Sequence, residues 1–237
     1  MRWEALAVQH RLVTTLPAFI LFDLDGTLVD TAPDLCAALN HALGVLGRPP
    51  VPADEVRHMV GHGARKLLAR GLGASGEVTA ELVEAGVPPF MAYYHAHIAD
   101  GSRPYPGVEA ALDALVAAGC GVAVCTNKPH ALAVELLEAL GWQDRFSAVL
   151  GFDSVPKAKP DAGHVLATLA AMGGRREDAV FVGDSITDVG AAHNAGLPVI
   201  AVSFGFSDRP VGELGADVVI DHFDELLPAL ERVWAAK

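Results

Sequence analysis

Four groups of polar residues come directly after apolar runs, and their types suggest a common chemistry. In an open parallel sheet, ligands bind outside the carboxyl ends of the strands. If the apolar runs are strands of such a sheet, the four groups are expected to lie together. They are Asp23-Leu24-Asp25-Gly26-Thr27, Thr126-Asn127-Lys128, Lys157 and Lys159 with Pro160, and Gly183-Asp184-Ser185-Ile186-Thr187-Asp188.

The acidic residues of these groups could hold a hard cation. Carboxylates at positions 23 and 25, joined by at least one of Asp184 and Asp188, offer the oxygen ligands that Mg²⁺ prefers. A lysine and a threonine hydroxyl supply the donors that a phosphoryl group needs. An aspartate can attack phosphorus to give an aspartyl phosphate, while a second acid protonates the leaving group and activates water. The residue types therefore indicate phosphoryl transfer.

Each group also has a plainer structural interpretation when it is taken alone. Asp25-Gly26 is a common turn dipeptide. Asp184 and Asp188 could cap the helix that follows them, and Lys159 could be a solvated charge. Because all four groups occur in order at expected strand ends, their conjunction favours the catalytic interpretation.

Apolar runs that alternate with helical spacing predict an α/β fold. Residues 18–24 form a continuous apolar run, typical of a strand buried on both faces of a parallel sheet. Between 31 and 100 the spacing is helical throughout, and Pro88-Pro89 is expected to interrupt a helix there. Strands are then expected near 121–126, 147–151, 179–183, 197–202 and 217–220, and helices near 108–118, 129–140, 161–172, 188–195 and 223–235.

This order predicts a Rossmann-like, doubly wound parallel sheet core with an inserted all-helical domain. The core would consist of residues 1–30 plus 101–237, and the helical domain of residues 31–100. Residues 1–17 are interpreted as an N-terminal extension of unknown role.

The composition narrows the class of protein. The 237 residues are 51% hydrophobic and 19% charged, which suits a globular chain with a sizeable core. A formal net charge of -12 argues against a binder of nucleic-acid phosphates. Three cysteines without a CxxC pair fit a reducing cytoplasm. The longest apolar run, from Ala114 to Cys125, is too short to span a bilayer, so no membrane partner is expected.

With these motifs, the sequence from Phe19 onward resembles the haloacid dehalogenase superfamily of Mg²⁺-dependent phosphatases, and most closely its phosphoglycolate phosphatase group. Residues 22–31 meet the first motif of that family. The resemblance implies that Asp23 is the nucleophile and that Asp25 is the general acid and base. Thr27 fits the same pattern and is expected among the substrate-binding residues.

The second motif of the family is a strand that ends in serine or threonine, and residues 122–129 meet it. The resemblance implies that Thr126 and Asn127 hold the phosphoryl oxygens, with Lys128 also in the substrate-binding set. The Thr-Asn-Lys-Pro run is especially similar to the phosphoglycolate phosphatases.

The third and fourth motifs complete the implied site. A lysine before proline is met by Lys159, which would stabilise the phosphoryl charge and orient Asp23, although Lys157 is close enough to compete for this role. Asp184 would bind Mg²⁺ together with Asp23 and the backbone carbonyl of Asp25. Asp188 would act through water or through Lys159. The implied metal set is therefore Asp23, Asp25, Asp184 and Asp188.

The family also has a helical cap inserted after the first motif, in agreement with the helical segment 31–100. Such a cap closes over the site and excludes water, with hinges expected near 30–33 and 102–106. Residues 60–66 resemble the cap loop that meets substrate. One interpretation puts Arg65 or Lys66 near a substrate carboxylate, and the other puts both on a solvated helix face.

The sequence therefore predicts a cytoplasmic, Mg²⁺-dependent phosphatase of a small phosphorylated metabolite, with 2-phosphoglycolate as the leading substrate, acting as a monomer or homodimer. Asp25 argues against dehalogenases and phosphonatases, which lack an aspartate at that position. Nucleotide, sugar-phosphate or pyrophosphate hydrolases stay open, because they differ mainly in the cap. A phosphoglucomutase-like isomerase and a non-catalytic binding module are the remaining alternatives.

Overall fold

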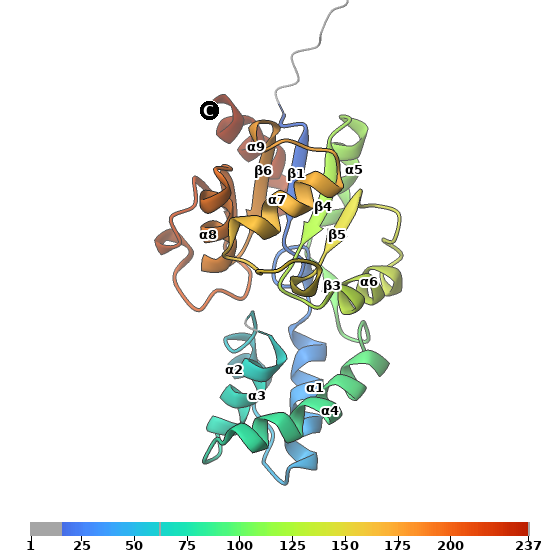
Figure 1. The fold of residues 1–237 in the computed structure, drawn as a ribbon, viewed down its shortest axis with the longest axis vertical. Coiled ribbons are helices and arrows are strands. Elements are labelled where there is room, and N and C mark those ends of the chain that lie inside the picture. Colours follow the sequence, from blue (N-terminus) through green and yellow to red (C-terminus); the bar gives the residue numbers. More distant parts are fainter. Residues whose placement is uncertain (1–15, 62, 237) are drawn as a thin grey trace, which may run out of the picture.

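The computed structural model describes residues 16–61 and 63–236 of the chain (Figure 1). A parallel sheet flanked by helices occupies one end of the molecule, and a group of helices from residues 32–96, here called the helical layer, occupies the other. Most of the expected N-terminal extension, residues 1–15, lies outside the described residues. No helix within the described ranges has both the length and the hydropathy of a membrane span.

Six strands form the central sheet, and every neighbouring pair is parallel. The order is β5-β4-β1-β6-β7-β8, so the chain moves outward to one side of β1 and then to the other. This arrangement confirms the predicted doubly wound α/β class. The strands are β1 (Phe19–Phe22), β4 (Gly121–Cys125), β5 (Ala148–Leu150), β6 (Ala179–Gly183), β7 (Val199–Val202) and β8 (Val218–Ile220).

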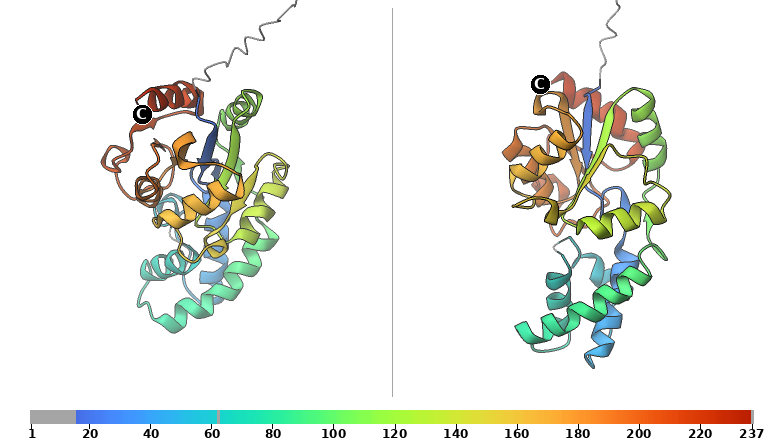
Figure 2. Two further views of the ribbon diagram at one scale, coloured as in Figure 1. Left: turned by 45° about the horizontal axis from the view of Figure 1, so that its top comes forward. Right: turned by 45° about the vertical axis from the view of Figure 1, so that its right-hand side comes forward.

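Helices cover both faces of the sheet because the strands are apolar on both faces (Figure 2). Ile20 and Phe22 of β1 belong to one hydrophobic cluster and Leu21 to the other, and all three are fully buried. The first cluster includes residues of α5 (Val108–Ala117), α6 (His130–Ala139) and α9 (Leu226–Ala235). The second includes residues of α7 (Ala162–Ala171) and α8 (Ile186–Ala195).

The helical layer contains α1 (Ala32–Val45), α2 (Ala53–Arg57), α3 (Ala64–Gly73) and α4 (Ala80–Ala96). Two short antiparallel strands, β2 (Val29–Asp30) and β3 (Arg103–Pro104), connect it to the rest of the chain. The buried carboxylate of Asp34 accepts hydrogen bonds from the backbone N–H groups of Gly101 and Ser102, both at 2.7 Å. This contact joins the entering and the leaving segment.

The prediction that Pro88-Pro89 interrupts a helix is wrong. Both prolines lie inside α4, which runs without a break through 17 residues. A proline in a helix interior removes a backbone hydrogen bond and costs about 3 kcal/mol. Here the buried side chains of Phe90 and Tyr94 and the close packing of Gly86 against Leu68 hold the helix in place. Tertiary packing therefore outweighs the local preference.

A short 3-10 helix and a capping box account for two differences at element ends. The 3-10 helices among the described residues are η1 (Phe152–Ser154), η2 (Arg176–Asp178), η3 (Val211–Glu213) and η4 (Phe223–Glu225). The last helix begins at Leu226 rather than near 223, because η4 occupies the preceding turn. The helix expected at 188–195 begins two residues earlier, because Ser185 and Asp188 form a capping box.

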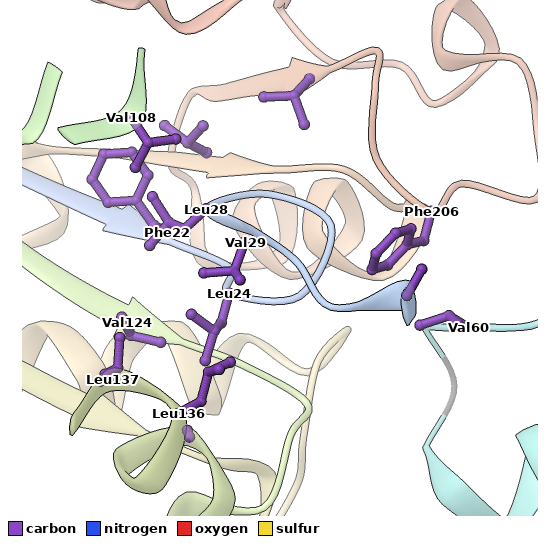
Figure 3. Close-up of a cluster of buried hydrophobic side chains, with 14 of the residues drawn as sticks. Phe22, Leu24, Leu28, Val29, Val60, Val108, Val124, Leu136, Leu137 and Phe206 are labelled. Atoms are coloured by element: carbon purple, nitrogen blue, oxygen red, sulfur yellow. The ribbon is translucent and has the colours of Figure 1, made fainter. Parts of the chain in front are cut away.

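The hydrophobic core of the sheet continues toward the helical layer (Figure 3). Leu24, Leu28 and Val29 follow β1 and are fully buried in the same cluster. At its far end, Val60 of the helical layer and Phe206 of the loop after β7 belong to this cluster as well. The loop that carries Asp25 is thus packed between the sheet and the helical layer.

Candidate active site

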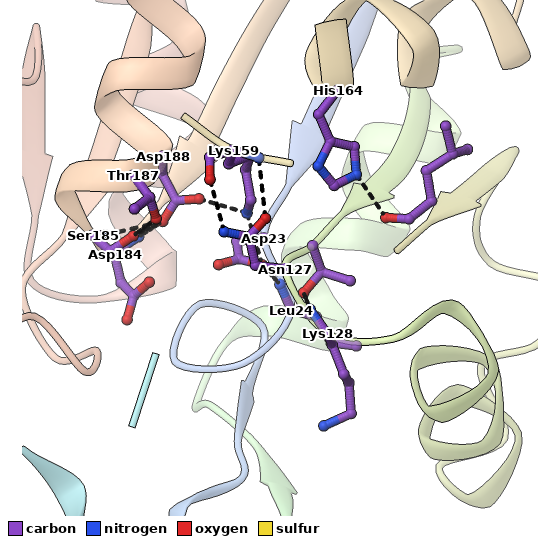
Figure 4. Close-up of polar contacts among 12 residues, drawn as sticks. Asp23, Leu24, Asn127, Lys128, Lys159, His164, Asp184, Ser185, Thr187 and Asp188 are labelled. Carbon is purple, nitrogen blue, oxygen red and sulfur yellow. Dashed lines mark hydrogen bonds and ion pairs between the residues drawn. The ribbon is translucent and has the colours of Figure 1, made fainter. Parts of the chain in front are cut away.

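Three aspartates and one lysine meet at the carboxyl ends of β1 and β6 (Figure 4). Asp23, Asp184 and Asp188 each offer a carboxylate oxygen within 4.8 Å of the others. Lys159, whose side chain is fully buried, places Nζ 3.1 Å from Asp23 Oδ1 and 2.6 Å from Asp188 Oδ1. The structure therefore brings together four residues that the sequence placed in three separate motifs.

The backbone around Asp23 fixes this arrangement. The Asp23 N–H donates to the carbonyl of Val182 at 2.9 Å, and Oδ1 of Asp23 accepts from the N–H of Leu24 at 2.7 Å. Gly26 has a φ of +83° in the turn that follows, and a Cβ there would collide with Oδ2 of Asp184. Only glycine leaves room for that carboxylate.

Asp188 has a structural role and an electrostatic one. Its Oδ2 accepts from the N–H groups of Asp184 and Ser185 at 3.2 and 3.0 Å and from the Ser185 hydroxyl at 2.5 Å. Its Oδ1 is the partner of Lys159. The helix-capping interpretation of Asp188 is therefore correct, and the same carboxylate also belongs to the buried cluster.

The cluster is electrostatically strained, because three acids share one lysine. Burial, together with Asp188 and Asp25, raises the pKa of Asp23 to about 7, although Lys159 acts in the opposite direction. Burial and the neighbouring carboxylates of Asp188 and Asp23 raise the pKa of Asp184 well above its ordinary value. Burial alone would lower the pKa of Lys159, but the two carboxylates raise it. A positive charge added to this site would relieve the repulsion.

The donor set suits Mg²⁺. Magnesium takes oxygen ligands and is usually held by one or two carboxylates. Asp184 supplies one carboxylate, whose Oδ2 accepts from the N–H of Phe206 at 2.6 Å, and Asp23 supplies a second. The side chain of Asp25 is not part of this group of three, and the metal contact of its backbone carbonyl stays a prediction. Two observations therefore favour Mg²⁺ here: the oxygen ligands that the carboxylates offer and the repulsion among their charges.

Asp25 instead faces a second buried lysine. Nζ of Lys128 lies 3.0 Å from Asp25 Oδ1 and 2.6 Å from the hydroxyl of Tyr94, on helix α4 of the helical layer. The Lys128 side chain is 4% exposed and that of Asp25 is 17% exposed. The two aspartates of the first motif thus have separate lysine partners, Lys159 for Asp23 and Lys128 for Asp25.

Three other predicted substrate-binding residues come from the first and second motifs, and two of them already make hydrogen bonds to backbone groups. The Asn127 amide donates to the carbonyl of Lys159 at 3.0 Å and accepts from its N–H at 3.1 Å, so it positions the lysine. The Thr126 hydroxyl accepts from the N–H of Lys128 at 3.1 Å. Thr27 is fully buried, and its hydroxyl has no hydrogen-bond partner among the described residues. The phosphoryl contacts of these residues stay predictions.

The structure places two predicted cations away from the cluster. Arg65 donates from Nε to Glu84 of α4 at 2.7 Å, and its side chain is 66% exposed. This contact matches the solvated interpretation, because a surface acid already holds the guanidinium. Lys157 is 78% exposed and lies 3.8 Å from Asp161, so Lys159 is the lysine of the third motif that faces the acids.

Sequence reasoning did not find Tyr94 or Arg57. Arg57, at the end of α2, donates to both carboxylate oxygens of Asp30 at 3.0 and 2.8 Å. It also donates to the Tyr105 hydroxyl at 3.0 Å and to the carbonyl of Phe204 at 3.3 Å. One side chain thus joins the helical layer to its connecting strand and to the loop after β7. A lone arginine in a helical segment carries no sequence signal for this role.

Comparisons with known proteins agree with this geometry. The family model for haloacid dehalogenase-like hydrolases matches residues 20–202. A phosphoglycolate phosphatase from Caulobacter vibrioides is 52% identical over 207 residues, covering 87% of each chain. One from Agrobacterium fabrum is 47% identical, covering 91% of this chain and 93% of its own. The crystal structure of a predicted phosphoglycolate phosphatase from Haemophilus somnus 129pt superposes with a TM-score of 0.84 at 33% identity, covering 92% of this chain and 99% of its own.

Proposed function

The chain belongs to the haloacid dehalogenase-like hydrolase family, and from this membership and its site we propose that it hydrolyses 2-phosphoglycolate to glycolate and phosphate. The chain is a phosphoric monoester hydrolase of that family. The names of the relatives described above support this particular substrate. The single observation that carries the reaction class is the buried group of Asp23, Asp184, Asp188 and Lys159 at the strand ends.

In the proposed first step, a carboxylate oxygen of Asp23 attacks phosphorus while the bond from phosphorus to the glycolate oxygen breaks. Lys159 lies 3.1 Å from Asp23, where it can orient the nucleophile and offset charge on the phosphoryl group. Asp25 gives its proton to the departing oxygen, and glycolate leaves. The product of this step is a phosphate ester of the Asp23 carboxylate.

In the second step, Asp25 takes a proton from a water molecule, which attacks the phosphorus of the aspartyl phosphate. The bond between phosphorus and the Asp23 oxygen breaks, so phosphate leaves and both aspartates return to their starting states. Asp23 and Asp184 are proposed to hold Mg²⁺, with Asp188 acting through water or Lys159. A bound Mg²⁺ would offset the repulsion between the phosphate and these carboxylates.

We also propose that residues 31–100 act as a cap on a core of residues 1–30 plus 101–237. The antiparallel pair of β2 with β3, the connection made by Asp34 and the bridging contacts of Arg57 support this division. A cytoplasmic location is a further part of the proposal, supported by three free cysteines among the described residues.

The test is phosphate release with Mg²⁺ or with EDTA from 2-phosphoglycolate, hexose phosphates, nucleoside monophosphates and pyrophosphate. We expect a Mg²⁺-dependent kcat/KM for 2-phosphoglycolate about a hundredfold above the others, which is about 2.7 kcal/mol of transition-state discrimination. The Asp23→Asn variant, purified in parallel, measures the background from contaminating phosphatases. A flat or shifted profile would contradict the substrate, and equal release with EDTA would contradict the metal.

A further inference from the structure

Lys128 and Tyr94 form a buried pair beside Asp25, apart from the cluster around Asp23. Nζ of Lys128 donates to the Tyr94 hydroxyl at 2.6 Å and lies 4.7 Å from the centroid of the Tyr94 ring. Its other partner is Asp25 at 3.0 Å. In Figure 4 the Lys128 side chain extends away from Asp188 and Lys159. The pair therefore has a location of its own, next to the proposed general acid.

Two hydrogen-bond donors of this pair have no acceptor among the described residues. A lysine ammonium has three N–H donors, and the hydrogen bonds of Lys128 to Asp25 and Tyr94 use two of them. The Tyr94 hydroxyl accepts from Lys128, so its own hydrogen stays available, and no described residue receives it. Both residues are buried, with 1% of Tyr94 and 6% of Lys128 exposed when backbone and side chain are counted together. Buried donors without acceptors cost about 1–3 kcal/mol each, so the pair suits an anionic acceptor ligand.

The position of the pair relative to the reaction identifies the acceptor. The leaving oxygen must lie within hydrogen-bond distance of Asp25, which protonates it. In 2-phosphoglycolate a single carbon separates that oxygen from the carboxylate. The carboxylate must then fall a few ångströms from Asp25, which is where Nζ of Lys128 lies. A carboxylate has two oxygens and one negative charge, matching two adjacent donors and one cation.

We propose that Lys128 and Tyr94 form a carboxylate subsite that selects phosphomonoesters with a carboxylate one carbon from the ester oxygen. This inference rests on the proposed function and deepens it. Because Lys128 follows β4 and Tyr94 belongs to α4, the subsite is complete only when the helical layer packs on the sheet. Substrate selection and closure of the helical layer are thereby linked through one hydrogen bond.

The test compares 2-phosphoglycolate with ethyl phosphate, in which a methyl group replaces the carboxylate. The Tyr94→Phe variant removes the hydroxyl and keeps the ring over Lys128. Tyr93→Phe is the matched control, because Tyr93 belongs to the same helix and stacks on His41 and His97, with centroids 4.7 and 4.3 Å away. We expect Tyr94→Phe to lower kcat/KM about tenfold for 2-phosphoglycolate, mainly through KM, and less than about twofold for ethyl phosphate. Tyr93→Phe should leave the ratio of the two unchanged.

An equal loss with both substrates would overturn the subsite, since Tyr94 would then act only by positioning Asp25. No loss with either substrate would overturn it as well. Competitive inhibition of ethyl phosphate hydrolysis by glycolate gives a second measurement. The inhibition constant of glycolate should rise about tenfold in Tyr94→Phe and should not change in Tyr93→Phe. The wild-type protein separates the two hypotheses. A wild type without preference for 2-phosphoglycolate refutes the proposed function, whereas a preference that Tyr94→Phe leaves intact refutes only the subsite.

Discussion

Replacing Asp184 by asparagine should stabilise the metal-free protein while removing its response to Mg²⁺. Two unit charges 4.8 Å apart repel by about 3.5 kcal/mol at an effective dielectric constant of about 20. Asp184 has two such neighbours, Asp23 and Asp188, but Lys159 offsets the charge of Asp188, so about one repulsion of this size remains. The new amide group needs an acceptor in a buried site, which costs about 1–3 kcal/mol. The net gain in the free energy of unfolding is then about 1–2 kcal/mol, a rise in Tm of roughly 2–8 °C.

The raised pKa of Asp184 determines how the difference in Tm between the two proteins changes with pH. The raised pKa of Asp184 means that the folded wild type binds more protons than the unfolded chain between about pH 4 and that pKa. The wild type therefore loses stability as the pH rises through this window, and the asparagine variant lacks this contribution. The difference in Tm should be small near pH 4 and should grow toward pH 7, the region to which burial also raises the pKa of Asp23.

The assay is calorimetry of the wild type and Asp184→Asn at several pH values. It compares their Tm values first without metal and then with MgCl₂. Mg²⁺ at a hundred times its Kd should raise the stability of the wild type by about 2.7 kcal/mol, and it should hardly change that of Asp184→Asn. Phosphate release by the variant should be lost. A lower Tm of the metal-free variant at pH 7, or a Mg²⁺ shift equal to that of the wild type, would refute the reasoning from charge crowding.

Other residues give predictions that separate buried from exposed charges. Lys159→Met should cost about 3–5 kcal/mol of stability, because it strands two buried carboxylates, whereas Lys157→Met, at a side chain 78% exposed, should cost less than about 0.5 kcal/mol. Thermal unfolding of the two variants checks this, and equal losses would contradict the pairing. Arg57→Ala should lower Tm by about 2–4 °C and reduce kcat/KM, because the half-buried guanidinium joins three segments, while Arg65→Ala should leave both unchanged. Burial and the charge of Lys159 lower the pKa of His164 to about 4, so its contribution to stability should be lost as the pH falls from about 6.5 toward 4, and its NMR resonances should not titrate near neutral pH.

The core fold and the acidic cluster were predictable because local signals determine them. Apolar runs such as residues 19–22 and 179–183 are typical of strands buried on both faces, and parallel strands bring their carboxyl ends to one edge. Asp23 and Asp184 directly follow such runs, so their proximity could be predicted before any other contact was known.

Contacts between the sheet and the helical layer were not predictable in the same way. Tyr94 is 34 residues from Lys128, within an amphipathic helix whose register alone does not reveal what it faces. The surroundings of Arg65 depend on Glu84, which packing of α3 against α4 brings within reach. The two prolines of α4 are tolerated for the same reason, because packing between helices decides the outcome. Such features depend on tertiary contacts that no local pattern encodes.

The central claim is that Asp23 carries the phosphoryl group during turnover. Borohydride reduces an acyl phosphate, so quenching the enzyme with borohydride during turnover of 2-phosphoglycolate and Mg²⁺ would convert a phosphorylated aspartate into homoserine, which peptide mass spectrometry locates. We predict homoserine at position 23 only when substrate and Mg²⁺ are both present, and none in the Asp23→Asn variant. Continued phosphate release with Asp23 unmodified, or conversion at another aspartate, would contradict the account.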